Sequence, residues 1–117
     1  MAYDETLAER IREYLADQPD ITVAKMFGGI AFIVGGRMAI SASGQGGVLV
    51  HVDPATAANL IARTNAEVAV MRGRPMNGWL RVKSEDLTTR TKLVKWVDRG
   101  TSYARSLPAK TPKRERS

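Results

Sequence analysis

Three glycine clusters divide residues 22 to 52 into short segments, and this division constrains the fold more than any other feature of the sequence. Gly35-Gly36 lies between two segments rich in β-branched and aromatic residues, and both glycines can adopt the positive φ of a two-residue hairpin turn. Gly28-Gly29 separates two further segments as either a turn or a bulge. The loop Ser43–Gly47 follows. Short segments joined this closely predict an antiparallel meander.

The segments between the glycines are rich in β-branched and aromatic residues, which favour strands. They predict four strands, at Thr22–Phe27, Ile30–Val34, Arg37–Ser43 and Val48–Val52. In the fourth strand the three valines share one face, while Leu49 and His51 share the other.

A second strand-forming region follows residue 66. Glu67–Met71 is ambiguous, and Arg72–Asn77, which contains Gly73 and Pro75, is predicted to be a loop. Gly78–Lys83 predicts a last strand, because apolar and basic residues alternate along it.

Three segments show the spacing of amphipathic helices. The first runs from about Asp4 to Asp17 and ends before Pro19. The second begins at Asp53-Pro54, because Asp53 can cap a helix and Pro54 suits its first position. The third starts near Leu87, and Gly100 is a candidate cap that would divide it in two.

The order of these elements is helix, four-strand meander, helix, strand, helix. This order predicts an α+β fold, with an antiparallel β-sheet and flanking helices. The length of 117 residues accommodates one domain, at 1–109, followed by a basic tail at 110–117 that we expect to be disordered. The longest apolar run, Ile30–Val34, is too short to cross a membrane, and the sequence has no cysteine and no signal-peptide pattern. We therefore expect a cytoplasmic protein without a membrane partner.

The charge is unevenly distributed along the chain. Residues 1–62 carry four basic and seven acidic side chains, whereas residues 63–109 carry ten basic and four acidic ones. A basic half can attract nucleic acid or an acidic protein, although basic residues also simply solvate a surface.

The basic half contains a candidate partner or nucleic-acid patch. Trp79 lies among arginines on a predicted strand, where a flat ring beside guanidinium groups can stack bases. A second stripe has helical spacing on the last helix. The residues of this patch are Arg72, Arg74, Trp79, Arg81, Lys83, Lys92, Lys95 and Arg99. The alternative is that Trp79 packs in the core and the cations are only solvated.

Catalytic signals are weak. His51 is the only histidine, and capping already explains its neighbour Asp53. A Ser-His-Asp arrangement can be drawn with Ser41 or Ser43, but nothing in the spacing distinguishes it. The glycine clusters lie between strands, whereas a phosphate loop joins a strand to a helix. We therefore expect no enzymatic activity, no catalytic residue, no metal and no cofactor.

Several motifs together carry a family resemblance. They are Lys25-Met26-Phe27-Gly28-Gly29, Gly35-Gly36-Arg37-Met38-Ala39, Leu49–Asp53, Arg72-Gly73-Arg74-Pro75-Met76, Gly78-Trp79-Leu80-Arg81-Val82, Trp96-Val97 and Tyr103-Ala104. In this order they resemble the TfoX N-terminal domain family, also called Sxy, from about Tyr3 to Lys110. The resemblance implies an α+β fold. The family's best-known members regulate natural competence in bacteria by promoting transcription together with the cyclic-AMP receptor protein.

The resemblance and the charge lead to two functional hypotheses. The first is a stand-alone, non-catalytic regulatory module that contacts proteins, with the transcription machinery as the partner the resemblance implies. The alternative is direct binding of nucleic acid through the basic half. A small-molecule hydrolase or transferase is a third, weaker hypothesis. We also expect a homodimer, because a small sheet can leave an edge or an apolar helix face uncovered.

Overall fold

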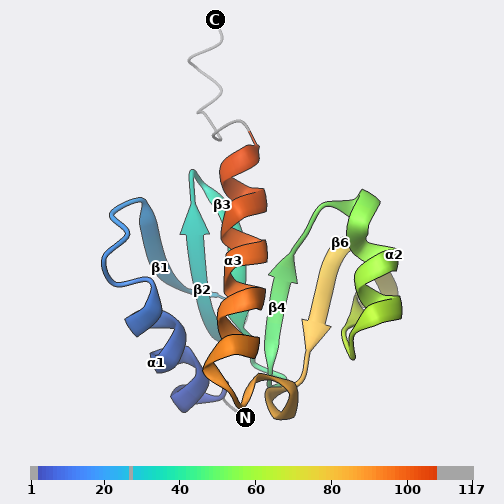
Figure 1. The fold of residues 1–117 in the computed structure, drawn as a ribbon, viewed down its shortest axis with the longest axis horizontal. Helices are drawn as coiled ribbons and strands as arrows, with labels where there is room; N and C mark the ends of the chain where they lie inside the picture. Colours follow the sequence, from blue (N-terminus) through green and yellow to red (C-terminus); the bar gives the residue numbers. More distant parts are fainter. Residues whose placement is uncertain (1–2, 27, 108–117) are drawn as a thin grey trace, which may run out of the picture.

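Six strands form one antiparallel sheet, and three α-helices contribute to a core on one of its faces (Figure 1). The computed structural model describes residues 3–26 and 28–107, so the predicted tail at 110–117 lies outside the described residues. The elements in chain order are α1 (Glu5–Tyr14), β1 (Ile21–Met26), β2 (Gly29–Val34), β3 (Arg37–Ala42), β4 (Val48–His51), α2 (Pro54–Arg63), β5 (Glu67–Met71), β6 (Arg74–Val82), the 3-10 helix η1 (Ser84–Leu87) and α3 (Arg90–Ser106). The predicted α+β fold is confirmed.

The sheet has the strand order β1-β2-β3-β4-β6-β5, so β5 and β1 form its two edges. Gly35 and Gly36 form the predicted two-residue turn between β2 and β3, with φ angles of 60° and 82°. Met26 pairs with Gly29, which places a hairpin rather than a bulge between β1 and β2. The predicted four-strand meander is therefore present.

Side-chain caps begin the three α-helices. The Asp4 carboxylate accepts a hydrogen bond from the Leu7 amide at 3.0 Å, and the Asp53 carboxylate accepts one from the Ala55 amide at 2.9 Å. Thr89 caps α3 in the same way. In the described part of the chain, no helix has both the length and the apolar character needed to cross a membrane.

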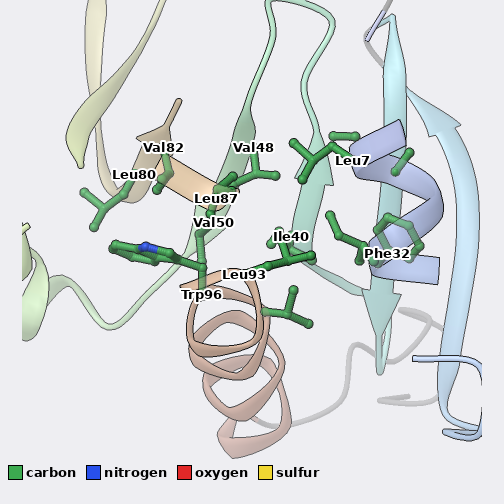
Figure 2. Close-up of a cluster of buried hydrophobic side chains, with 14 of the residues drawn as sticks. Leu7, Phe32, Ile40, Val48, Val50, Leu80, Val82, Leu87, Leu93 and Trp96 are labelled. Atoms are coloured by element: carbon green, nitrogen blue, oxygen red, sulfur yellow. The ribbon is translucent and has the colours of Figure 1, made fainter. Parts of the chain in front are cut away.

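The core lies between the sheet and the three helices (Figure 2). It takes alternate residues of the central strands, including Ile40, Val50 and Leu80, which are fully buried. Trp96 of α3 packs among them with 5% of its surface exposed. Because strand residues alternate in direction, the intervening residues point to the opposite face of the sheet, here called the back face.

The β5–β6 hairpin differs from the sequence prediction. The ambiguous segment 67–71 is a strand, and β6 begins at Arg74, so only Arg72 and Gly73 turn between them. Both have positive φ, at 54° and 78°. A register shift between Val68 and Ala69 accommodates the longer β6. Pro75 is tolerated because β4 pairs only with residues 79–82 of β6, so at Pro75 the strand has a partner on one side only.

The prediction that Gly100 divides the last helix is wrong, because α3 is continuous from Arg90 to Ser106. A side chain at Gly100 would collide with the backbone carbonyl of Ala39 on β3. Glycine at this position therefore allows α3 to approach the sheet closely, rather than ending the helix.

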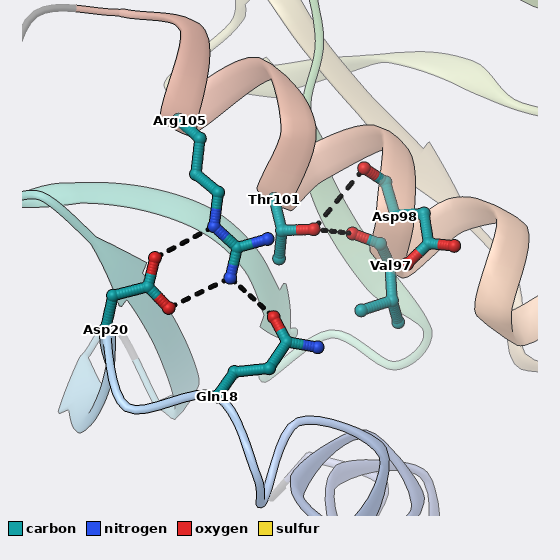
Figure 3. A network of polar contacts seen from close by, with 6 residues as sticks. All are labelled: Gln18, Asp20, Val97, Asp98, Thr101 and Arg105. Carbon is teal, nitrogen blue, oxygen red and sulfur yellow. Dashed lines mark hydrogen bonds and ion pairs between the residues drawn. The ribbon is translucent and has the colours of Figure 1, made fainter.

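An exposed network of hydrogen bonds connects the end of α3 to the segment after α1 (Figure 3). The Arg105 guanidinium donates two hydrogen bonds to the Asp20 carboxylate, at 2.8 and 2.9 Å, and a third to Gln18. This hydrogen-bonded ion pair lowers the pKa of Asp20 and raises the pKa of Arg105. Thr101 on the neighbouring turn bonds within the helix, to the carbonyls of Val97 and Asp98.

Candidate functional site

The structure divides the predicted patch among separate parts of the molecule. Arg72 lies in the β5–β6 turn, with Arg74 at the start of β6, and both are exposed. Arg81 and Trp79 line a pocket on the back face, and Lys83 is exposed just after β6. The three predicted residues of α3 come together in a different groove. The predicted residues therefore do not form one continuous surface, and their roles stay predictions.

The residues of α3 line a groove of about 280 Å³ between this helix and the end of α2, here called the basic groove. Lys92, Lys95 and Arg99 lie on one stripe of α3 because they are three and four residues apart. Arg63, the last residue of α2, faces them across the groove. Its remaining lining residues are Thr64, Asn65, Ala66, Val82, Asp86 and Trp96.

Local hydrogen bonds hold the α2 side of the basic groove in shape. The Thr64 hydroxyl donates to the Leu60 carbonyl at 2.7 Å and accepts from the Ala66 amide at 3.1 Å. The Asn65 side-chain amide donates to the Asp86 carboxylate at 3.0 Å, which connects this segment to η1. These bonds fix the backbone that carries Arg63 into β5.

The basic groove is strongly cationic. Four basic side chains line it, and Asp86 is its one acidic lining residue. Within residues 3–26 and 28–107, the ion pairs are Arg12 with Glu9 and Arg105 with Asp20, so none of the four groove cations is paired. Asp98, the one acidic residue of α3, instead accepts a hydrogen bond from Tyr14 at 2.8 Å, which raises the pKa of Tyr14. The groove therefore presents a positive charge that the described residues do not neutralise.

Arg99 is oriented by the floor of the groove. Its guanidinium lies over the Trp96 ring, 4.5 Å from the ring centroid, in a cation–π contact. Trp96 is almost fully buried, so the ring supports Arg99 from below and offers little surface to a ligand. The contact leaves Arg99 facing the groove without an anionic partner.

Arg63 is the groove residue that the sequence did not reveal. Helical spacing identifies the stripe on α3 because it is a local pattern, whereas Arg63 joins that stripe only through the packing of α2 and α3 on the same sheet face. The sequence shows only that Arg63 is a basic residue in the last turn of a predicted helix. A favourable interaction with the helix dipole is enough to explain a basic residue there.

His51 lies in an aromatic cluster rather than in a catalytic arrangement. Its ring stacks on Trp79 and meets Tyr103 edge-on, with the Tyr103 centroid 5.0 Å away. Its buried Nδ1 atom has no hydrogen-bond partner among the described residues, and the carboxylate of Asp53 caps α2 instead. The Ser-His-Asp arrangement considered from the sequence is therefore not assembled here.

Comparison with known proteins gives one positive result. Searches of curated proteins and of solved structures found no match. A family model described as the TfoX N-terminal domain matches residues 13–104, which include most of α3 and both walls of the basic groove. The chain therefore belongs to the TfoX N-terminal domain family.

Proposed function

We propose that this chain is a non-catalytic regulatory module that binds an acidic segment of a partner protein in the basic groove. The observation that carries the proposal is the convergence of Arg63, Lys92, Lys95 and Arg99 on one groove without ion-pair partners among the described residues. Exposed cations without ion-pair partners are well solvated by water. They attract a complementary anionic surface and orient it as it binds. The TfoX resemblance directs the proposal to a partner in the transcription machinery.

The shape of the groove favours a protein segment over nucleic acid. Proteins that bind single strands stack bases on exposed aromatic rings, whereas Trp96 is buried beneath Arg99. Helices that read duplex DNA enter its major groove, whereas this stripe of α3 faces a recess beside α2. A chain of Asp and Glu side chains can instead enter the recess and reach cations on both walls.

Binding of a defined acidic probe tests the proposal. We would measure the fluorescence anisotropy of a labelled peptide of alternating Glu and Ala, and of a labelled mixed-sequence DNA duplex, as the protein is added. We expect the peptide to bind more tightly than the duplex. Lys95→Glu should weaken peptide binding by about tenfold, because it places a repulsive charge in the groove.

Lys25→Glu is the matched control. Lys25 is exposed on β1, and this substitution changes the net charge by the same amount as Lys95→Glu. We expect it to alter peptide affinity by less than about twofold, because exposed charges farther apart than about 10 Å are largely screened at moderate salt. An equal loss of peptide affinity in both variants would contradict binding of the peptide in the basic groove. Tighter binding of the duplex, with a slope of about −0.9 per phosphate contact in a plot of log affinity against log salt, would favour the nucleic-acid alternative.

A further inference from the structure

The back face of the sheet contains a second concavity, of about 240 Å³, that the basic groove does not involve. It crosses β3, β4, β6 and β5, and we call it the back pocket. Its apolar lining comes from Met38, Leu49, Val70, Met76 and Trp79. Apolar pockets with a few converging polar groups are where small molecules usually bind.

The polar groups of the back pocket gather around the loop between β3 and β4. Arg81 is the one charged residue of its lining, and its guanidinium donates to the Gly46 carbonyl at 3.2 Å and to the Gln45 side-chain oxygen. Both acceptors are neutral, so they orient the guanidinium without cancelling its charge. Ser41 and Ser43 contribute hydroxyl groups to the same lining.

Hydrogen bonds within this loop fix its backbone. The Ser43 and Gly47 backbones bond at 2.9 Å, as do those of Gly46 and Ser43, and the Ser43 hydroxyl accepts from the Gln45 amide at 3.1 Å. Gly47 has a φ of 66°, and a side chain there would collide with the Val82 carbonyl. The polar wall is thus preorganised, which reduces the entropy cost of binding.

We propose that the back pocket binds a small amphipathic carboxylic acid, with its apolar body against Trp79 and Leu49 and its carboxylate on Arg81. A guanidinium matches a carboxylate in both charge and shape. A concavity of about 240 Å³ suits one ring or a short branched chain.

Glu67 is the acidic residue that bears most directly on this proposal. It lies opposite Arg81 in the sheet register, on the edge strand β5. Within the described residues it forms no ion pair with Arg81, whose guanidinium is directed to the loop at Gln45 and Gly46. Its charge nevertheless opposes an incoming anion, so Glu67→Gln should tighten carboxylate binding by about twofold.

A pair of matched probes tests the proposal. Phenylacetate and 2-phenylethanol share an aromatic body, and only the first has a carboxylate. Titrated into labelled protein and followed by amide chemical shifts, phenylacetate should shift the amides of residues 43–47 and the indole of Trp79. We expect a Kd on the order of 1 mM, and binding of 2-phenylethanol weaker by about tenfold.

Variants separate the carboxylate contact from the apolar one. Arg81→Met should weaken the binding of phenylacetate by about tenfold and change the affinity for 2-phenylethanol by less than about twofold. Trp79→Ala should weaken the binding of both compounds. Arg12→Met, on α1, is the control of the same residue type and should change neither. The amide spectrum of each variant establishes that it is folded.

Several results would overturn the proposal. Equal affinities of the unaltered protein for the two probes would show that Arg81 does not bind the carboxylate. Shifts confined to Arg63 and to the α3 stripe would assign the anion to the basic groove. A dimer that dissociates on Trp79→Ala, without any binding of phenylacetate, would assign the pocket to a second copy of the chain.

Discussion

The imidazole of His51 on β4 and the indole of Trp79 on β6 are stacked, with ring centroids 4.2 Å apart and planes 4° apart. The two residues are direct cross-strand partners. Burial lowers the pKa of His51, a backbone hydrogen bond with Met38 opposes this effect, and the positive charge of Arg37 lowers the pKa further. The folded protein therefore favours neutral His51.

Stability should fall as the pH is lowered from about 7.5 to 5.5. Below about pH 6.5 an unfolded chain protonates its histidine, whereas folded His51, with a depressed pKa, stays neutral for longer. The unfolded state then binds more protons, so the free energy of unfolding decreases as the pH falls. Urea unfolding at several pH values measures this dependence.

His51→Gln provides the control for that experiment, because glutamine does not titrate. The variant should lose most of the pH dependence in this window while keeping a polar side chain beside Trp79. An unchanged pH profile in His51→Gln would show that other groups are responsible.

Trp96→Ala should lower the free energy of unfolding by about 3–5 kcal/mol, since it removes a large buried side chain. Urea denaturation measures the loss. Thr91→Ala, at an exposed position on the same helix, should change it by less than about 0.5 kcal/mol. A loss below about 1 kcal/mol for Trp96→Ala would mean that this face of α3 does not pack on the sheet.

Gly100→Ala should destabilise the protein by about 1–3 kcal/mol, because the new methyl group would collide with the Ala39 carbonyl. In a solvent-exposed helix the same substitution would stabilise by about 1 kcal/mol. The sign of the change in thermal unfolding is therefore informative. A rise in the unfolding midpoint would contradict the close approach of α3 to β3.

The homodimer stays a prediction, and we expect it to form through the edge strand β5. Val68 and Val70 are 39% and 51% exposed there. Light scattering should report a dimer for the unaltered chain and a monomer for Val68→Lys. Val23→Lys, on the opposite edge strand β1, should leave the dimer intact, and a monomeric unaltered chain at every concentration would reject the interface.

The meander was predictable because its turns depend on local chemistry. Gly35 and Gly36 both adopt positive φ, and capping by Asp4 and Asp53 starts helices where expected. The start of β6 was not, because Pro75 disfavours a strand, and the sequence does not show that β6 is paired on one side only at this position. The prediction for Gly100 is wrong because the carbonyl that excludes a side chain at this position belongs to Ala39 of β3, which lies far away in the sequence.

The candidate site follows the same division between local and long-range order. Helical spacing groups Lys92, Lys95 and Arg99, and strand alternation groups Trp79 with Arg81, as the structure shows. Neither pattern says which face of the sheet each group occupies. The separation of these groups, and the addition of Arg63 to the first, arise only from tertiary packing.

Mapping the acidic peptide onto the protein by amide chemical shifts tests the central claim most directly. Titration with the peptide of alternating Glu and Ala should give saturable shifts largest at Arg63–Ala66 and Lys92–Arg99, on the two walls of the basic groove. Shifts concentrated at the Arg72–Arg74 turn, or no saturable shift at moderate salt, would contradict it.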